Sequence, residues 1–90
     1  MGEMRVKMSV DDVAATLLAW VGSEIYDASV GIEADTNLIE GGLDSFSLLR
    51  ILVFIEKTFG LRIPEAEINE ERMRSIESMS RLIHELLEYR

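Results

Sequence analysis

An acid and a serine at the start of an apolar helical run are the residues of this chain that could support chemistry. Asp44 and Ser45 follow a pair of glycines and precede the run from Phe46 to Lys57. Asp44 suits the N-cap position, where its carboxylate accepts hydrogen bonds from the free amides of the first turn. Ser45 is then the first helical residue, and its hydroxyl is expected to face solvent because it has no backbone role. The partial positive charge of a helix N-terminus would favour a phosphate attached at this hydroxyl.

The glycine pair before this helix supports the same interpretation. Gly41 and Gly42 are expected to keep bulky side chains away from the Ser45 hydroxyl. Glycine also adopts backbone angles that other residues avoid, so the pair lets the loop turn sharply into the helix.

The residues around Ser45 resemble a known family. The run GLDSF at 42–46 is similar to the Gly-x-Asp-Ser-Leu signature of acyl carrier proteins and of the carrier domains of peptide synthetases. The runs DTNL at 35–38 and FGLRIP at 59–64 extend the resemblance, which spans roughly residues 10–87. It implies that Ser45 is esterified by 4′-phosphopantetheine from coenzyme A through a phosphopantetheinyl transferase. In the family the aspartate before the serine helps to hold magnesium at the transferase interface, and Asp44 occupies that place.

The same resemblance implies that the protein catalyses nothing. The arm ends in a thiol that carries acyl or aminoacyl groups as thioesters and presents them to loading and transfer enzymes.

Departures from the family pattern point to a specialised carrier of a dedicated lipid, polyketide or peptide-type pathway. Phe46 replaces the usual leucine, as it does in D-alanyl carrier proteins. Arg50 stands where fatty-acid carriers commonly have glutamate, whereas Glu56 matches an acidic position. A cation at Arg50 would repel the basic docking patches of fatty-acid enzymes. The alternative is a solvated arginine whose stem covers Phe46 and Phe54.

Length and composition bound the remaining possibilities. Ninety residues without cysteine predict one small domain, residues 1–90, with residues 1–8 frayed and no disulfide framework. A net charge of −8 would repel nucleic acid and anionic membranes and would attract basic partner surfaces. No apolar run reaches membrane-spanning length, and the first residues lack the apolar segment of a signal peptide. We therefore expect a cytoplasmic monomer without membrane insertion.

Hydrophobic periodicity predicts an all-α fold. Apolar residues recur at helical spacing in the first and last parts of the chain, and the run after Ser45 is apolar almost all round. Between the first two helices lies a long loop, in which Ile32 and Leu38 are expected to anchor the chain to the core. The prediction is a small four-helix bundle of three main helices and one short helix, with helices at about 10–22, 45–58, 70–73 and 76–87.

The second predicted helix has more apolar surface than a core requires. Ile51 and Ile55 of this helix and Leu82 of the last helix are expected to be buried between the two helices. Leu49, Val53 and Phe54 are left over, and such surface in a small protein typically faces a partner or a bound acyl chain. The residues expected to recognise the transferase or other partners are Asp44, Phe46, Arg50, Val53 and Glu56.

Two other classes of function compete with a modified carrier. One is a carrier-like bundle that serves as an interaction module, with Ser45 never modified. The other is a small acidic enzyme, which the residue inventory disfavours because His84 is the only histidine and no sheet is predicted to present a serine nucleophile. A calcium site at residues 35–37 is excluded because Ile39, Glu40 and Phe46 stand where an EF-hand needs an oxygen ligand, glycine and glutamate. No catalytic or metal-binding residues are therefore predicted.

Overall fold

A computed structural model describes residues 8–27 and 29–89 of the chain. In this part of the chain the secondary structure is entirely helical. The elements are α1 (Val10–Glu24), α2 (Ser45–Phe59), the single 3₁₀ turn η1 (Glu65–Glu67), α3 (Glu70–Met73) and α4 (Ile76–Glu88). The predicted fold class is confirmed, with three main helices, one short helix and a long first loop. Residues 1–8 were predicted to fray. Residues 1–7 lie outside the described residues, and the prediction was wrong for Met8, which is partly buried and packs against the core.

Helix starts follow the capping residues that the sequence offers. Ser9 and Asp12 form a reciprocal capping box at the start of α1, with both backbone-to-side-chain hydrogen bonds at 3.1 Å. Asn69 caps α3 by accepting from the Arg72 amide at 2.9 Å. Ser75 caps α4 by accepting from the Ser78 amide at 3.0 Å.

Three helices end later than predicted, α4 by the single residue Glu88. α1 continues through Gly22 to Glu24, because Val21 is fully buried and its carbonyl accepts from the amides of Ile25 and Tyr26. Burial of Val21 outweighs the cost of a helical glycine, which is about 1 kcal/mol. α2 continues to Phe59, which is itself buried, and ends at Gly60 with a left-handed backbone (φ 66°).

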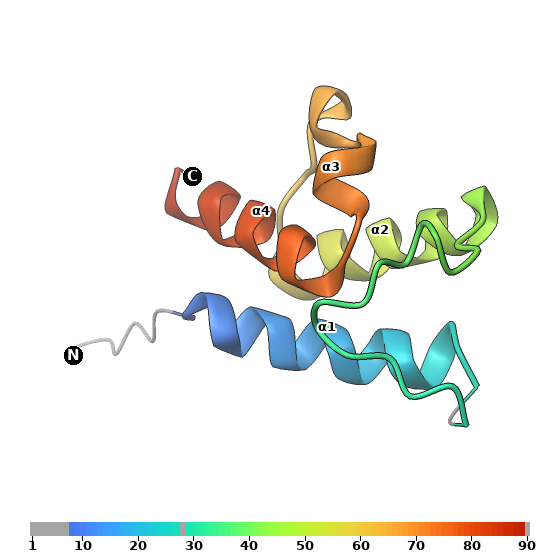
Figure 1. Cartoon of the computed structure of the whole chain (residues 1–90). Helices are drawn as coiled ribbons and strands as arrows, with labels where there is room; N and C mark the ends of the chain where they lie inside the picture. The colour runs from blue at the N-terminus through green and yellow to red at the C-terminus, as the bar shows by residue number, and fades with distance from the viewer. Residues whose placement is uncertain (1–7, 28, 90) are drawn as a thin grey trace.

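The core lies between α1, α2 and α4. Figure 1 shows α1 running in the opposite direction to α2 and α4, with α3 standing against α4. Each long helix contributes fully buried side chains, the loops add Leu38 and Ile63, and α3 adds Met73. The buried apolar residues are Val13, Leu17, Val21, Leu38, Ile51, Ile55, Phe59, Ile63, Met73, Ile76, Met79, Leu82 and Ile83.

The long first loop is tied to the start of α4. Leu38 is 1% exposed, and its amide donates to the carbonyl of Arg74 at 2.7 Å. The amide of Glu77 donates to the carbonyl of Ala34 at 2.9 Å. The predicted anchoring is confirmed, since Ile32 also packs against the core. Figure 1 shows the loop crossing the bundle from the end of α1 to the start of α2.

Phe54 of α2 packs within the chain, although the sequence suggested that the core would not need it. The ring of Phe54 stacks on Trp20 of α1, with centroids 4.4 Å apart and planes 12° from parallel. Expecting Phe54 to face a partner was therefore wrong. The spacing of residues along α2 does not reveal which side chain of α1 lies opposite. Leu49 and Val53 remain exposed, as expected.

Truncating the predicted core residues of α2 and α4 should strongly destabilise the fold. Ile51→Ala, Ile55→Ala and Leu82→Ala should each lower the free energy of unfolding by about 2–5 kcal/mol, because each removes a nearly fully buried side chain. Chemical denaturation measures this loss. Leu49→Ala is the control, since Leu49 is 56% exposed and its truncation should change stability little. Equal stability of all four variants would contradict the assigned helix faces.

Candidate functional site

The Ser45 hydroxyl stands free at the first position of α2. Ser45 is exposed and makes no hydrogen bond through its hydroxyl within the described residues. Asp44 before it is the N-cap, with an extended backbone and a carboxylate Oδ1 that accepts from the Ser47 amide at 2.7 Å. The carbonyl of Asp44 accepts from the Leu48 amide at 3.0 Å. Capping therefore occupies Asp44 and leaves the neighbouring hydroxyl available for chemistry.

The two glycines before Asp44 have different roles. Gly42 has φ +94°, a backbone conformation that favours glycine, and no heavy atom would lie within 4 Å of an added Cβ. Gly41 lies close to the preceding loop: an added Cβ would come within 3.4 Å of the Asn37 carbonyl oxygen. The unusual backbone angles predicted for the pair are therefore found at Gly42 and not at Gly41. For Gly41, the close approach is to the loop backbone.

The carboxylate of Asp44 is electrostatically coupled to a tyrosine at the end of α1. Hydrogen bonding from Ser47 lowers the pKa of Asp44 below its usual value. Burial, and then the negative charge of Asp44, raise the pKa of Tyr26. The Tyr26 hydroxyl is buried and has no hydrogen-bond partner within the described residues. The sequence carried no signal for this neighbour, because the long loop brings it to the site.

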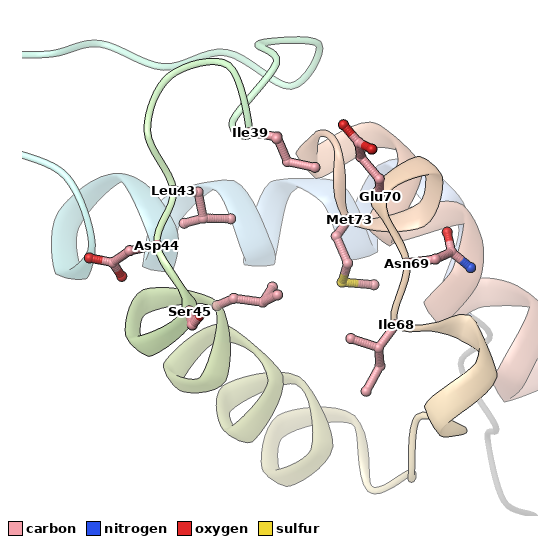
Figure 2. Close-up of a pocket in the computed structure, with 9 residues that line it drawn as sticks. Ile39, Leu43, Asp44, Ser45, Ile68, Asn69, Glu70 and Met73 are labelled. Atoms are coloured by element: carbon pink, nitrogen blue, oxygen red, sulfur yellow. The ribbon is translucent and has the colours of Figure 1, made fainter.

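A mainly apolar cavity of about 210 Å³ lies beside Ser45. Figure 2 shows the side chains of Ile39, Leu43, Ile68 and Met73 directed into it, whereas Asp44 points away from it. The walls come from the end of the first loop, the start of α2 and the stretch around α3. The complete lining is Ile39, Leu43, Asp44, Ser45, Leu48, Ile68, Asn69, Glu70 and Met73. No sequence pattern pointed to this cavity, since its walls are far apart along the chain.

An exposed apolar strip begins next to Ser45 along α2. We define this strip as Phe46, Leu49 and Val53, whose exposed fractions are 70%, 56% and 46%. They are spaced three and four residues apart and therefore share one face of the helix. Two of them, Phe46 and Val53, were predicted to recognise partners.

Besides Asp44, which caps α2, two charged residues were predicted for recognition, and both are already engaged within the chain. Arg50 Nη1 donates to the Glu24 carbonyl at 3.3 Å, and its Nη2 lies 4.0 Å from the Glu24 carboxylate. The Arg50 guanidinium also lies over Trp20, 5.8 Å from the ring centroid. Glu56 accepts from the Ile63 amide at 3.1 Å. The alternative prediction was that the Arg50 stem covers Phe46 and Phe54. Instead, the ring of Trp20 stacks on Phe54, and Phe46 stays exposed.

Comparison with known proteins identifies the class to which this fold and site belong. Residues 15–83 match the family described as phosphopantetheine attachment site. This match covers most of the chain and includes Ser45, and the chain belongs to that family. Residues 15–83 therefore form a carrier domain, the kind of domain to which 4′-phosphopantetheine is attached covalently.

Among curated proteins, the chain is similar to aminoacyl carrier protein 2 of Bradyrhizobium diazoefficiens. The two are 31% identical over 55 residues, which cover 61% of this chain and 62% of that protein. The match thus spans less than two thirds of the relative's length.

The residues present fit the prosthetic group. A phosphodiester on Ser45 would stand at the positive end of α2, and the exposed hydroxyl is accessible for attachment.

None of the helices in the described part of the chain combines the length and apolar character needed to cross a bilayer.

The stabilising hydrogen bond of Asp44 should depend on pH. Its pKa is lowered in the folded state, so the contribution is present above the ordinary carboxyl pKa and is lost as pH falls through the lowered value. The stability of the parent relative to Asp44→Asn should therefore fall on acidification, because asparagine caps without titrating. Denaturation at several pH values, with an NMR titration of the Asp44 carboxyl, measures this. A constant difference between the two proteins across that range would contradict the assignment.

Proposed function

We propose that Ser45 carries the 4′-phosphopantetheine arm and that the thiol of the arm carries acyl or aminoacyl groups as thioesters. The observation that carries this proposal is the exposed, unbonded Ser45 hydroxyl at the start of a helix capped by its neighbour Asp44. The family match and the GLDSF run around Ser45 support it.

Attachment uses the Ser45 oxygen as the nucleophile. Ser45 Oγ forms a new bond to the pantetheinyl phosphorus of coenzyme A as the phosphorus–oxygen bond to the nucleotide half of the pyrophosphate breaks. The nucleotide half leaves with that oxygen as a terminal phosphate, and the hydroxyl proton passes to a base of the transferase. The first-turn amides and helix dipole of α2 favour the resulting anionic phosphodiester. Asp44, whose pKa is lowered, stays ionised at neutral pH and can bind the magnesium ion at the transferase interface.

The cavity beside Ser45 suits a small apolar cargo. Its inward-facing side chains are aliphatic or sulfur-containing, and its volume is below the roughly 300–1,000 Å³ of pockets that enclose drug-sized ligands. We propose that it shelters the acyl part of the thioester when the arm folds back onto the bundle. The aminoacyl carrier relative supports short acyl or aminoacyl groups as the cargo class.

Partners are proposed to dock on the face of α2 that carries the exposed strip. They are a phosphopantetheinyl transferase and the enzymes that load and unload the arm. The strip lies next to the attachment serine, so an enzyme reaching Ser45 would contact it. Arg50 and Glu56 contribute at its margins, but both are bound within the chain, which makes the central contact apolar. This differs from the ionic docking implied for fatty-acid carriers and supports a specialised pathway.

Replacing Ser45 should abolish modification. After incubation with coenzyme A and a broad-specificity transferase, intact mass should rise by one phosphopantetheinyl group in the parent and not at all in Ser45→Ala. Ser47→Ala is the matched control, since it removes a hydroxyl two residues away while keeping the backbone amide that Asp44 binds. Helix content should persist in both variants. An unmodified parent would favour the interaction-module alternative, and a modified Ser45→Ala would place the site elsewhere.

Making the strip polar should weaken docking without unfolding the protein. Val53→Ser should lower the transferase kcat/KM about 5- to 30-fold, as loss of an interface residue worth about 1–2 kcal/mol does. Val30→Ser is the matched control, because Val30 is similarly exposed (55%) but lies in the first loop. The deficit should persist at high salt, since apolar contacts are not screened. Equal rates for the two variants would show that the strip is not the docking contact.

A further inference from the structure

Arg72 of α3 is held by carboxylates on two other elements. Its Nη1 and Nη2 donate to the two oxygens of Glu85 on α4, at 3.2 and 2.8 Å. Its Nε donates to Glu67 Oε1 on η1, at 3.1 Å. The guanidinium therefore joins α3, α4 and η1 through charge-assisted bonds. The paired bonds to Glu85 have the bidentate geometry in which arginine binds carboxylate best.

The segment that Arg72 ties down is one wall of the cavity beside Ser45. Ile68, Asn69, Glu70 and Met73 line that cavity and lie between or next to the clasped residues. Figure 2 shows Ile68 and Met73 directed inward from this segment, and Figure 1 shows α3 standing out from the bundle. Displacing this segment would therefore open the cavity on the side of α3.

The rest of the wall is anchored mainly at its C-terminal end. The carbonyl of Arg72 accepts from Ser78 Oγ at 2.8 Å, and the carbonyl of Arg74 accepts from the Leu38 amide at 2.7 Å. Within the described residues, every hydrogen bond from residues 65–72 to α4 involves Arg72, through its guanidinium or its carbonyl. Releasing the guanidinium would leave the C-terminal end hinged in place and free residues 65–70.

The three side chains of the clasp are partly exposed to water, so its ion pairs can order the segment and can also break. The side chains of Arg72, Glu67 and Glu85 are 27%, 37% and 49% exposed, so water competes for each of them. Isolated surface ion pairs contribute little, whereas a shared bidentate arrangement contributes more. Hydrogen bonding to Arg72 lowers the pKa of Glu85, so the carboxylate stays ionised at neutral pH.

We infer that the Arg72 clasp with Glu67 and Glu85 is a latch that sets how often the cavity beside Ser45 opens. Arg72 is thus a positioning residue, acting on access rather than on the prosthetic group. That the opening admits or releases cargo rests on the proposed function, whereas the opening itself is expected in the unmodified protein as well.

Amide hydrogen exchange on the unmodified chain tests the latch. The reporters are four amides that the segment protects: Glu67 and Ile68, bonded to Pro64 and Glu65, and Arg72 and Met73, bonded to Asn69. Arg72→Gln and Glu85→Gln should each speed exchange of Glu67 and Ile68 about three- to tenfold, with smaller gains at the hinged amides. Arg72→Lys should give an intermediate rate, since lysine keeps the charge but not the bidentate geometry. The amides of Ile51 and Ile55 report global unfolding.

Arg81→Gln is the matched control. It breaks another surface ion pair of α4, from Arg81 Nη2 to Glu77 at 3.2 Å, without touching the cavity wall. It should leave exchange of Glu67 and Ile68 unchanged. The latch is overturned if Arg72→Gln leaves these rates at the parent value, if Arg81→Gln raises them equally, or if exchange rises uniformly with Ile51 and Ile55. None of these outcomes depends on whether Ser45 is modified, so failure of the latch and failure of the attachment site can be told apart.

Discussion

The hydrogen bond from the Leu38 amide to the Arg74 carbonyl, 2.7 Å long, decides where the first loop ends and therefore where Ser45 stands. Burial of the Leu38 side chain reinforces it. Four residues beyond Leu38, the chain turns through Gly42 and enters α2 at Asp44. The loop residues that follow this anchor, Ile39 and Leu43, form the cavity wall opposite α3. A long loop on the surface thus has the positional role that its apolar residues Ile32 and Leu38 indicated in the sequence.

Two of the three charged side chains on α2 are engaged within the chain, whereas Lys57 in its last turn is exposed. Arg50 is shared between the Glu24 carbonyl and the ring of Trp20, and Glu56 is bound to the Ile63 amide. Both contacts also fasten α2 to its neighbours, so each charge contributes to the fold. What remains at the centre of the exposed face is the apolar strip beside Ser45. The overall charge of −8 consequently says little about the chemistry of this surface.

Packing is strong around α1, α2 and α4 and weaker around α3. The three long helices share fully buried aliphatic residues, whereas α3 has four residues and contributes one buried side chain, Met73. Much of the order of the short segment then depends on capping by Asn69 and on polar contacts of Arg72. Because such contacts exchange with water more readily than a core unpacks, local opening is expected there before anywhere in the main bundle. Under the proposed function, weaker packing around α3 would let the cavity open while the main bundle stays folded.

The sequence by itself determined the elements, their caps and the candidate attachment residue. These properties are local: Asp44 caps because of its type and its place before an apolar run, and Gly60 ends α2 because it accepts a left-handed backbone. The buried faces of Ile51, Ile55 and Leu82 followed from periodicity for the same reason. Only the tertiary structure decided that Phe54 stacks on Trp20, that Arg50 turns to Glu24, and that loop, α2 and α3 enclose a cavity. These contacts join residues that are distant along the chain, and their partners depend on helix directions and crossings that no local spacing encodes.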